Sequence, residues 1–429
     1  MTGWGGPMSR RQPSNDSSNK DNNSLQTQIL TKPQDNVGSK NLRSNEFPDA
    51  EFAKMKTIHQ TAPKVDQDIL DQIINGSVHL VDISFDPIKY NKKNTNVSYS
   101  GVFGRFCTVD WSLHKNDPAA HPMFRFLVQK SPGCAKPVNV NFKEIVDKVK
   151  EFDKTNNGND VHVMAPKGFV FHESRCGSTL VANSLAAMDP SKNRVYSESP
   201  PPLEVLKSCG LHKGACGGGD QAIQLFRDVV YMMGRTNDAK EQNLFFKIQS
   251  VGTKYIDIAR MAFPEVPWIF VYRDPVQVMM SHLKYGPHRA NCVRQLSIPP
   301  THLKTILDGK GLTKKKMTPE HQCAIHLNTL CESAVSSLQS SPSYGKAVNY
   351  NLLPGILVDS IVPEHFGVPL SSADRARITE ISSTYSKGKG EAIEWKEDSS
   401  EKEKNASVEV KSAADLFLYE SFRKLEGLA

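Results

Sequence analysis

A short loop in the middle of the chain has the residue types of an anion-binding site. The segment FVFHESRCGSTLVANSL, residues 169–185, predicts a buried strand, a tight turn and an apolar helix. Gly177 allows the backbone to approach an anion closely, and Ser178 and Thr179 bring hydroxyl donors to the first turn of the helix. The first amides of that helix have no intrahelical acceptor and lie at the positive end of its dipole. Arg175 adds a planar cation suited to phosphate or sulfate oxygens, so the loop predicts a site for such an anion.

The order of residues in this loop argues against hydrolysis of a nucleoside triphosphate. The loop that binds ATP or GTP has the order GxxxxGK[ST], in which the lysine reaches the terminal phosphates and the Ser or Thr holds magnesium. Residues 175–179 have the order R-C-G-S-T, without the lysine. The alternative without a ligand is an ordinary strand–turn–helix in which the serine caps the helix.

A second motif with residues suited to binding a ligand lies about a hundred residues further on, in IFVYRDPVQVMMSHL. Arg273 stands at the end of a predicted buried strand, where open α/β sheets bind their ligands. Asp274 and Pro275 are a favourable N-cap and first residue for the next helix, and Ser281 lies about two turns into it. The alternative interpretation makes Arg273 a structural ion-pair partner.

Strands and helices alternate from residue 168 onward, and most of the strands are continuously apolar. This pattern indicates a parallel sheet that is covered on both faces. We therefore predict an α/β fold in three layers, of the P-loop type, with a central parallel sheet flanked by helices. The expected strands are 168–171, 194–198, 243–248, 266–272 and 346–353, and the expected helices are 178–188, 221–235, 255–263 and 275–283.

The chain divides into three parts by composition. Residues 1–45 are rich in Asn, Ser, Gln, Asp and Lys and predict a disordered tail. Residues 46–160 predict an accessory α+β segment packed on the core, and residues 161–429 predict the P-loop domain. Within residues 46–160 we expect helices at 52–60, 65–76 and 142–154 and strands at 78–85 and 98–113. Within residues 161–429 we also expect a polar, basic surface excursion or lid at 286–320, a solvated loop at 396–404 and a closing helix at 412–425.

Taken together, the two motifs resemble the PAPS-binding elements of the sulfotransferase family. R-C-G-S-T-L, residues 175–180, is similar to the 5′-phosphosulfate loop R-S-G-[ST]-[ST]-[LF] of the carbohydrate sulfotransferase branch. R-D-P-x(5)-S, residues 273–281, is similar to the family's 3′-phosphate element, including the spacing from arginine to serine. Cys176 replaces the usual serine, which removes one hydroxyl and keeps the size of the side chain. The resemblance spans about 168 to 396.

Two further segments resemble the family less closely. YSKGKGEAIEWKED, residues 385–398, is similar to the C-terminal segment that closes over the 3′-phosphate, which implies contacts from Lys387 and Lys389. The alternative for these lysines is a flexible basic loop. VNYNLLPGILVDSIVPEHFGV, residues 348–368, resembles the family's Tyr-x-x-Leu segment and the helix after it, which implies that Tyr350 lies near the adenine.

The resemblance implies transfer of a sulfuryl group from 3′-phosphoadenosine 5′-phosphosulfate (PAPS) to a hydroxyl or amine acceptor, which gives PAP and a sulfated product. Such a reaction depends on positioning and charge stabilisation, and it implies no metal. Arg273 and Ser281 would hold the 3′-phosphate. The 5′-phosphosulfate would be held by Arg175, Cys176, Gly177, Ser178 and Thr179.

A hydroxyl acceptor also needs a general base within hydrogen-bond reach. The carbohydrate branch uses a Glu after the second strand, and VYSESPPPLEV supplies Glu198 there, with Glu204 as the second choice. Where the cytosolic branch has a His after the third strand, this chain has Gln249 and Ser250. Lys247 could face the sulfate, or instead pair with Glu198 or Glu173. Three residues that flank the two motifs are further candidates for the base: His172, Glu173 and His282.

Two other functions remain open from the sequence. A P-loop kinase-like phosphotransferase would need a magnesium carboxylate at a strand end, where Asp274 stands. A sulfotransferase-like protein that binds an anion or a partner without catalysis would explain Cys176. The three possible functions, counting the sulfotransferase, can be distinguished by measuring PAP binding, ATP binding with magnesium and sulfate transfer.

Composition limits the remaining possibilities. The chain has 429 residues, 38% of them hydrophobic, and a net charge of +7, which is a mild excess consistent with an anionic ligand and not diagnostic of nucleic acid. No run of about 18 apolar residues predicts a transmembrane helix, and the N-terminus lacks the apolar region of a secretory signal. The eight cysteines form no CxxC motif, and Cys323, His326 and Cys331 predict a buried helix face rather than a metal site. These features suggest a reducing compartment, the cytoplasm.

Overall fold

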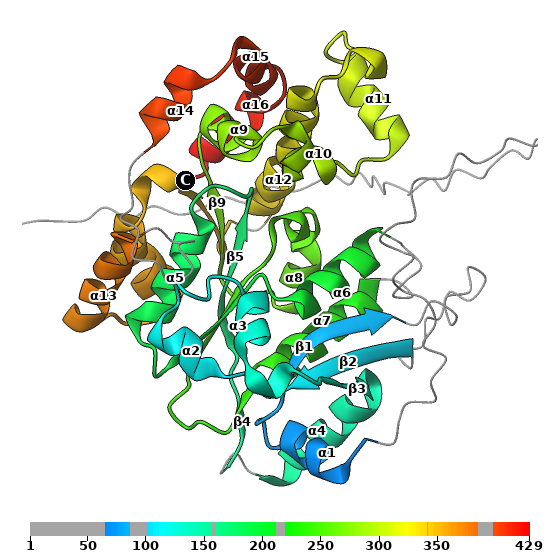
Figure 1. The fold of residues 1–429 in the computed structure, drawn as a ribbon, viewed down its shortest axis with the longest axis vertical. Coiled ribbons are helices and arrows are strands. Elements are labelled where there is room, and N and C mark those ends of the chain that lie inside the picture. Colours follow the sequence, from blue (N-terminus) through cyan, green and yellow to red (C-terminus); the bar gives the residue numbers. More distant parts are fainter. Residues whose placement is uncertain (1–64, 86–100, 157–159, 212–218, 341, 385–397) are drawn as a thin grey trace, which may run out of the picture. The chain divides into compact units, whose positions relative to one another are not determined.

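The computed structural model describes residues 65–85, 101–156, 160–211, 219–340, 342–384 and 398–429 (Figure 1). Gln60–Ala429 form one compact unit. The expected tail at 1–45 and the expected helix at 52–60 lie outside the described residues. So do Lys387, Lys389 and nearly all of the basic segment that contains them.

The larger part of the described chain is built on a five-stranded parallel sheet with the strand order β10-β9-β5-β8-β6. All five predicted strands are confirmed. In the register of the two central strands, His172 at the end of β5 is opposite Val271 near the end of β9. The two sequence motifs therefore leave neighbouring strands at the same edge of the sheet. The strands are β5 (Pro166–His172), β6 (Asn193–Ser197), β8 (Asn243–Lys247), β9 (Trp268–Tyr272) and β10 (Gly345–Asn349).

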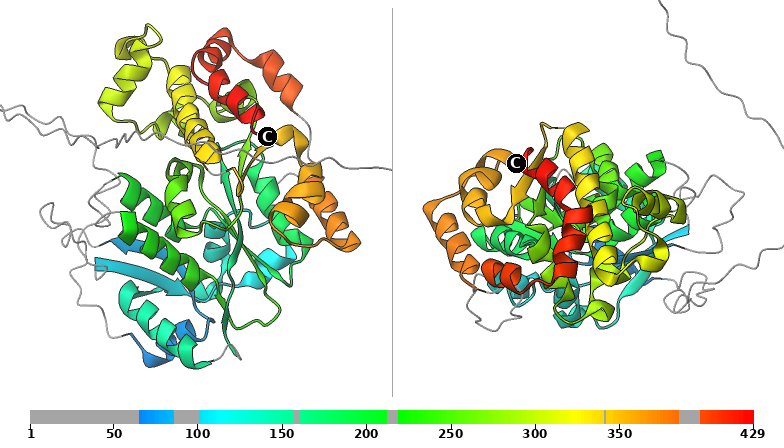
Figure 2. Two further views of the ribbon diagram at one scale, coloured as in Figure 1. Left: turned by 180° about the vertical axis from the view of Figure 1, so that it is seen from behind. Right: turned by 90° about the horizontal axis from the view of Figure 1, so that it is seen from above.

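Alternate residues of these strands enter two separate apolar cores, because successive side chains of a strand point to opposite faces. On one face Val170 packs in a cluster with Val181 of α5 (Ser178–Met188). On the other face Phe169 contacts the ring of Phe226 in α7 (Gly219–Met233). The predicted fold class, a parallel sheet between two layers of helices, is confirmed (Figures 1 and 2).

Further helices surround the sheet and its carboxyl edge. Those expected at 255–263 and 275–283 are present as α8 and α9. The long helix α12 and the π-helical segment η8 complete the covering. Their bounds, with those of the other helices of this part, are α6 (Pro200–Leu211), η4 (Ser250–Tyr255), α8 (Ile256–Ala262), α9 (Pro275–Leu283), α12 (Pro319–Ser340), η7 (Tyr350–Leu352), η8 (Leu357–His365) and α13 (Ser372–Ser382).

The segment before the central sheet forms a three-stranded antiparallel sheet, β1 (His79–Phe85), β2 (Val102–Cys107) and β3 (Val138–Asn141). Strand β1 packs against α6 and α7. The strand expected at 98–113 ends at Cys107, because the side chain of Asp110 caps a helix there by accepting from the Ser112 amide at 3.1 Å. The other elements of this part are α1 (Gln67–Ile74), α2 (Trp111–Asn116), α3 (Phe124–Lys130), η3 (Pro132–Cys134), α4 (Phe142–Asn156) and the pair β4 (His162–Val163) and β7 (Arg235–Thr236).

The C-terminal part differs from expectation in two places. The charged run expected as a solvated loop contains a helix, α14 (Ser399–Asn405), whose first turn is supported by an ion pair from Lys402 to Asp398. The single closing helix is two helices, α15 (Val408–Phe417) and α16 (Tyr419–Glu426), which meet at Leu418. The basic excursion contains η5 (Pro287–Arg289), α10 (Asn291–Arg294), α11 (Pro300–Asp308) and η6 (Lys314–Lys316).

Among the residues that the structure describes, four cysteines are paired, which corrects the expectation that the cysteines form no disulfide framework. Cys107 of β2 is bonded to Cys134, and Cys292 of α10 is bonded to Cys323 of α12. The partners are 27 and 31 residues apart, so no short spacing motif marks them in the sequence. In the described ranges, no helix is long and apolar enough to cross a membrane.

Candidate functional site

The carboxyl edge of the central sheet contains the strained backbone of the structure. Ser174, Arg175 and Glu198 have φ values of 77°, 56° and 54°, and they are the non-glycine residues with positive φ among those described. Two of them follow β5 and the third follows β6. Such conformations are unfavourable for L-residues and concentrate at functional sites, so they mark this edge as the candidate site.

Gly177 is required where it stands for two reasons. Its φ is 84°, and a Cβ at this position would lie 2.5 Å from the ring of Tyr350. The ring therefore lies directly against the loop at the start of α5. The guanidinium carbon of Arg273 lies 4.1 Å from the centre of the same ring, a cation–π contact. Tyr350 thus joins the two motifs that the sequence predicts to act together.

Glu173 joins the same two motifs through the backbone. Its carboxylate, 2% exposed, accepts the Arg273 amide at 2.5 Å and the Cys331 thiol at 3.3 Å. Burial raises the pKa of Glu173 to about 8, although the hydrogen bonds from Arg273 and Cys331 act in the opposite direction. Glu173 is a buried support between β5 and β9, whereas the sequence suggested it as a candidate base.

Cys176 faces the core. Its thiol is fully buried and donates to the Val271 carbonyl at 3.0 Å, and burial raises the pKa of this thiol to about 12. The group that Cys176 can offer an anion is therefore its backbone amide. Ser178 and Thr179 begin α5 and are buried at 4% and 3% exposure, while the side chain of Arg175 is exposed.

Three of the predicted catalytic side chains come together at the ends of β5, β6 and β8. Lys247, 1% exposed, forms a hydrogen-bonded ion pair with Glu198. This pair is one of the two alternatives predicted from the sequence, the other being a lysine that faces the sulfate. The Nε2 of His172 lies 3.7 Å from the Glu198 carboxylate. The Nδ1 of His172 accepts the Ser174 amide at 3.0 Å, which places the hydrogen of a neutral ring on Nε2, toward Glu198. The Glu198 amide in turn donates to the Lys247 carbonyl at 2.7 Å.

The other candidates lie elsewhere or have structural partners. Glu204 is on α6 and pairs with Lys207 at 3.0 Å. His282 is buried on α9. Asp274 is the predicted N-cap of α9, accepting from Val276 and Gln277 at 2.9 and 3.1 Å, and its other oxygen accepts from Tyr419. A carboxylate used in this way is poorly placed to hold magnesium.

The surroundings of Arg273 include residues that the sequence did not suggest. Its Nε donates to Gln277 at 2.7 Å, and its Nη2 donates to Asp398 at 3.0 Å and to Ser399 at 2.8 Å. Gln277 is one helical turn after Arg273, a spacing that could have been noticed. Asp398 and Ser399 are distant in the sequence and carry no such signal. The predicted Ser281 is half-buried and donates to the Gln277 carbonyl at 3.0 Å.

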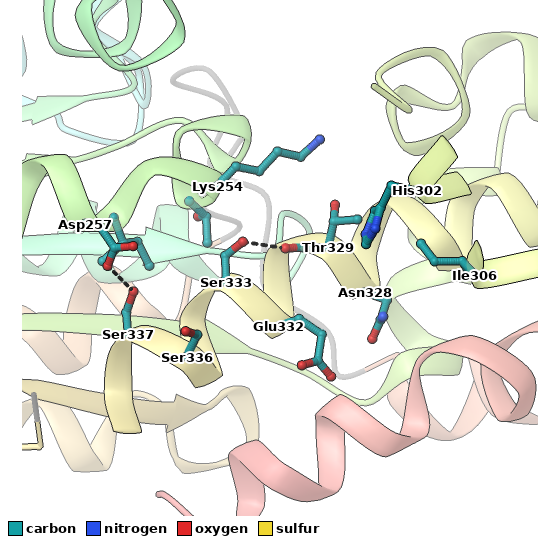
Figure 3. Close-up of a pocket in the computed structure, with 12 residues that line it drawn as sticks. Lys254, Asp257, His302, Ile306, Asn328, Thr329, Glu332, Ser333, Ser336 and Ser337 are labelled. Atoms are coloured by element: carbon teal, nitrogen blue, oxygen red, sulfur yellow. Dashed lines mark hydrogen bonds between the residues drawn. The ribbon is translucent and has the colours of Figure 1, made fainter. Parts of the chain in front are cut away.

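A cavity of about 560 Å³, lined largely by residues with polar side chains, lies near the end of β5, between η4, α8, α11 and α12 (Figure 3). Its wall includes Thr253, whose hydroxyl donates to the His172 carbonyl at 3.2 Å. Several wall hydroxyls use their hydrogens within the protein: Thr329 donates to a carbonyl, as does Ser333, and Ser337 donates to Asp257. The oxygens of these groups are acceptors, which suits a ligand rich in O–H or N–H donors. Among the described side chains, no group of three His, Cys, Asp or Glu is placed to hold a metal ion.

Comparison with known proteins gives distant structural likenesses. No family model and no curated protein sequence matches the chain. Several solved structures do, and sulfotransferases are among them. Sulfotransferase STF9 from Mycobacterium avium is 11% identical with a TM-score of 0.39, over 84% of this chain and 97% of that one.

Two other matches have similar statistics. The sulfotransferase domain from the curacin biosynthetic pathway is 15% identical with a TM-score of 0.35, over 62% of this chain and 98% of that one. Sulfotransferase STF1 from Mycobacterium tuberculosis is 14% identical with a TM-score of 0.34, over 65% of this chain and 85% of that one. All three TM-scores are below 0.5.

Proposed function

We propose that the chain is a sulfotransferase that moves a sulfuryl group from PAPS to a hydroxyl or amine acceptor, giving PAP and a sulfated product. One arrangement carries this proposal: Tyr350 and Glu173 join the strained loop before α5 to Arg273 at the end of β9. An anion-binding loop and a buried arginine side by side suit a nucleotide with phosphate groups at two positions.

The residues of the loop fit the 5′-phosphosulfate. The amides from Gly177 onward, the hydroxyls of Ser178 and Thr179 and the guanidinium of Arg175 would stabilise the negative charge that develops on the 5′-phosphate. Arg273 would hold the 3′-phosphate, which ATP lacks, and Ser281 would support that end of the site. Tyr350, stacked between the two motifs, would lie beside the nucleoside.

The cluster at the ends of β5, β6 and β8 fits proton transfer from the acceptor. PAPS supplies an activated sulfuryl group, whose S–O bond to the 5′-phosphate breaks as the acceptor oxygen or nitrogen attacks sulfur. The Glu198 carboxylate would receive the proton that the acceptor loses. Lys247 would hold Glu198 in place and bring positive charge to the sulfate, while His172 would help to orient Glu198 through the same carboxylate oxygen.

The acceptor and the compartment follow from other parts of the chain. The cavity near the end of β5 favours an acceptor with several O–H or N–H groups, because its wall hydroxyls present oxygen acceptors. The disulfides favour an oxidising compartment over the cytoplasm that the sequence suggested.

The test combines binding and transfer. PAP should raise the melting temperature of the chain, whereas ATP with magnesium should not, and labelled sulfate should pass from PAPS to a polyol or amine in an acceptor screen. Arg273→Ala should weaken PAP binding by about 10- to 100-fold, because a buried charge-assisted phosphate contact is lost. The exposed Arg375→Ala is the matched control and should bind PAP as the wild type does. If PAP does not bind, or binds equally to both variants, the proposal is wrong; binding without transfer indicates a non-catalytic protein.

A further inference from the structure

The carboxylate of Asp398 forms an ion pair with Arg273, the arginine assigned to the 3′-phosphate. Arg273, whose side chain is 5% exposed, donates from Nη2 to the Oδ1 of Asp398 at 3.0 Å. The same Nη2 donates to the hydroxyl of Ser399 at 2.8 Å. An internal anion therefore binds where the proposed function requires an anion from the nucleotide.

A second cation binds the same carboxylate. The ammonium of Lys402 lies 2.8 Å from Oδ1 and 2.7 Å from Oδ2 of Asp398. Although partial burial acts in the opposite direction, the hydrogen bonds from Lys402 and Arg273 hold the pKa of Asp398 below its ordinary value. Asp398 is thus ionised at neutral pH, between Arg273 at the end of β9 and Lys402 of α14.

Helix α14 is attached at this place by polar contacts. Gln277 accepts from Arg273 Nε at 2.7 Å through its Oε1 and donates to the Glu403 carboxylate at 2.6 Å through its Nε2. None of the residues of α14 is buried. A short helix held by a few polar contacts opens at low free-energy cost, because it has little apolar surface to expose.

We propose that Asp398 is an internal substitute for the 3′-phosphate, and that Lys402 and Ser399 become ligands of that phosphate when Asp398 withdraws. This inference rests on the proposed function. A carboxylate and a phosphate accept hydrogen bonds from the same donors. They cannot share them closely, because like charges in a partly buried site repel.

The arrangement makes nucleotide binding a competition. A ligand must displace Asp398 before it gains Arg273 and Lys402, so its apparent affinity is reduced by the fraction of molecules in which the carboxylate has left. A dianionic 3′-phosphate can replace the lost ion pairs, whereas a nucleotide with a free 3′-hydroxyl cannot. Asp398 thereby lowers the affinity for nucleotides that carry a 3′-phosphate and leaves the affinity for those with a free 3′-hydroxyl unchanged.

The first experiment removes the competing charge. Asp398→Asn should bind PAP about tenfold more tightly than the wild type, since one charge-assisted contact no longer has to be broken. Glu401→Gln changes the charge of the same helix by the same amount at an exposed position, and its PAP affinity should stay within about twofold of the wild type. Adenosine 5′-monophosphate, which lacks the 3′-phosphate, should bind Asp398→Asn and wild type alike.

The second experiment removes the proposed additional ligand. Lys402→Met should weaken PAP binding about fivefold, with Lys404→Met, exposed on the same helix, as the matched control. The loss should be absent for adenosine 5′-monophosphate, because the effect requires the 3′-phosphate.

The outcomes separate this inference from the proposed function. If Arg273→Ala weakens PAP binding while Asp398→Asn and Lys402→Met match their controls, the substitute role of Asp398 is wrong and the nucleotide site stands. If neither wild type nor Asp398→Asn binds PAP, both fall. Binding by Asp398→Asn alone supports both, since the wild type would then be held closed by its own carboxylate.

Discussion

At the scale of single residues, Glu173 shows how the site is held together by a group that takes no part in the proposed reaction. Its buried carboxyl receives one hydrogen bond from the amide of Arg273 and another from the thiol of Cys331. Strand β5, strand β9 and helix α12 therefore meet at one side chain. A neutral carboxyl suits this place, because burial raises the pKa of Glu173 to about 8.

The raised pKa predicts a stability that depends on pH. Between the ordinary pKa of 4.5 and about 8, the unfolded chain has lost the proton of Glu173 and the folded chain keeps it. The contribution of Glu173 to the free energy of unfolding is therefore complete below pH 4.5 and is lost as the pH rises toward 8. Glu173→Gln keeps the acceptor for Arg273 and does not titrate.

Urea unfolding at pH 5 and pH 8 measures this effect. Relative to the wild type, Glu173→Gln should gain unfolding free energy between the two pH values. The exposed variant Glu401→Gln should show no such gain, which removes changes common to the whole chain. A difference between Glu173→Gln and wild type that is the same at both pH values contradicts the prediction.

At the scale of elements, the site depends on how tightly α5 and η7 meet. Gly177 combines a positive φ with a backbone that touches the Tyr350 ring, so a side chain there is strained twice. Gly177→Ala should lose about 1–2 kcal/mol of unfolding free energy because of the left-handed conformation alone, and more because of the clash with Tyr350. It should also weaken PAP binding, since Tyr350 and the stacked Arg273 must move.

Gly286 provides the matched control. Its φ is 85°, nearly that of Gly177, and a Cβ there would meet nothing within 4 Å. Gly286→Ala should therefore show the conformational cost without the clash and keep the affinity for PAP. Equal losses of unfolding free energy and of affinity in the two variants would mean that the Tyr350 contact is unimportant. Urea unfolding and PAP titration measure the two quantities.

The elements also show what the sequence could predict. The five central strands and the helices α5, α7, α8 and α9 could be predicted from runs of apolar residues, because both faces of the sheet are buried. The two motifs were predicted to share a site, and parallel strands bring their ends to one edge. Helix α14 was predicted to be a loop, because its charged residues lack any apolar period.

The parts of the site that the sequence did not reveal depend on contacts between distant segments. Nothing in KEDSSEKEK indicates that Asp398 lies on Arg273, 125 residues away. Glu173 and Cys331 likewise meet across 158 residues. Glu198 and Lys247 could be proposed together because both follow strands of one sheet, and this pair is present.

At the scale of the whole molecule, two disulfides of the described residues link separate elements. Cys107–Cys134 connects β2 with the turn after α3, in the segment that precedes the central sheet. Cys292–Cys323 closes the excursion that contains α10 and α11 onto α12, which also forms one wall of the cavity near the end of β5. An excursion of mixed short helices gains stability when its two ends are linked, because the unfolded chain loses freedom.

The second disulfide predicts a dependence of stability on redox state. For a separation of 31 residues, the double variant Cys292→Ala/Cys323→Ala should lose about 3–4 kcal/mol of unfolding free energy relative to the oxidised wild type. In reductant the unfolding free energy of the wild type should fall to that of the double variant in reductant, because the Cys292–Cys323 bond is then absent from both. Alkylation in denaturant supplies the control within the same chain: Cys176 and Cys331, which are free, should react without reductant, whereas Cys292 and Cys323 should react only after reduction. Alkylation of Cys292 or Cys323 without reductant, in protein purified under oxidising conditions, would show that the bond does not form. The proposal of an oxidising compartment would then lose its support.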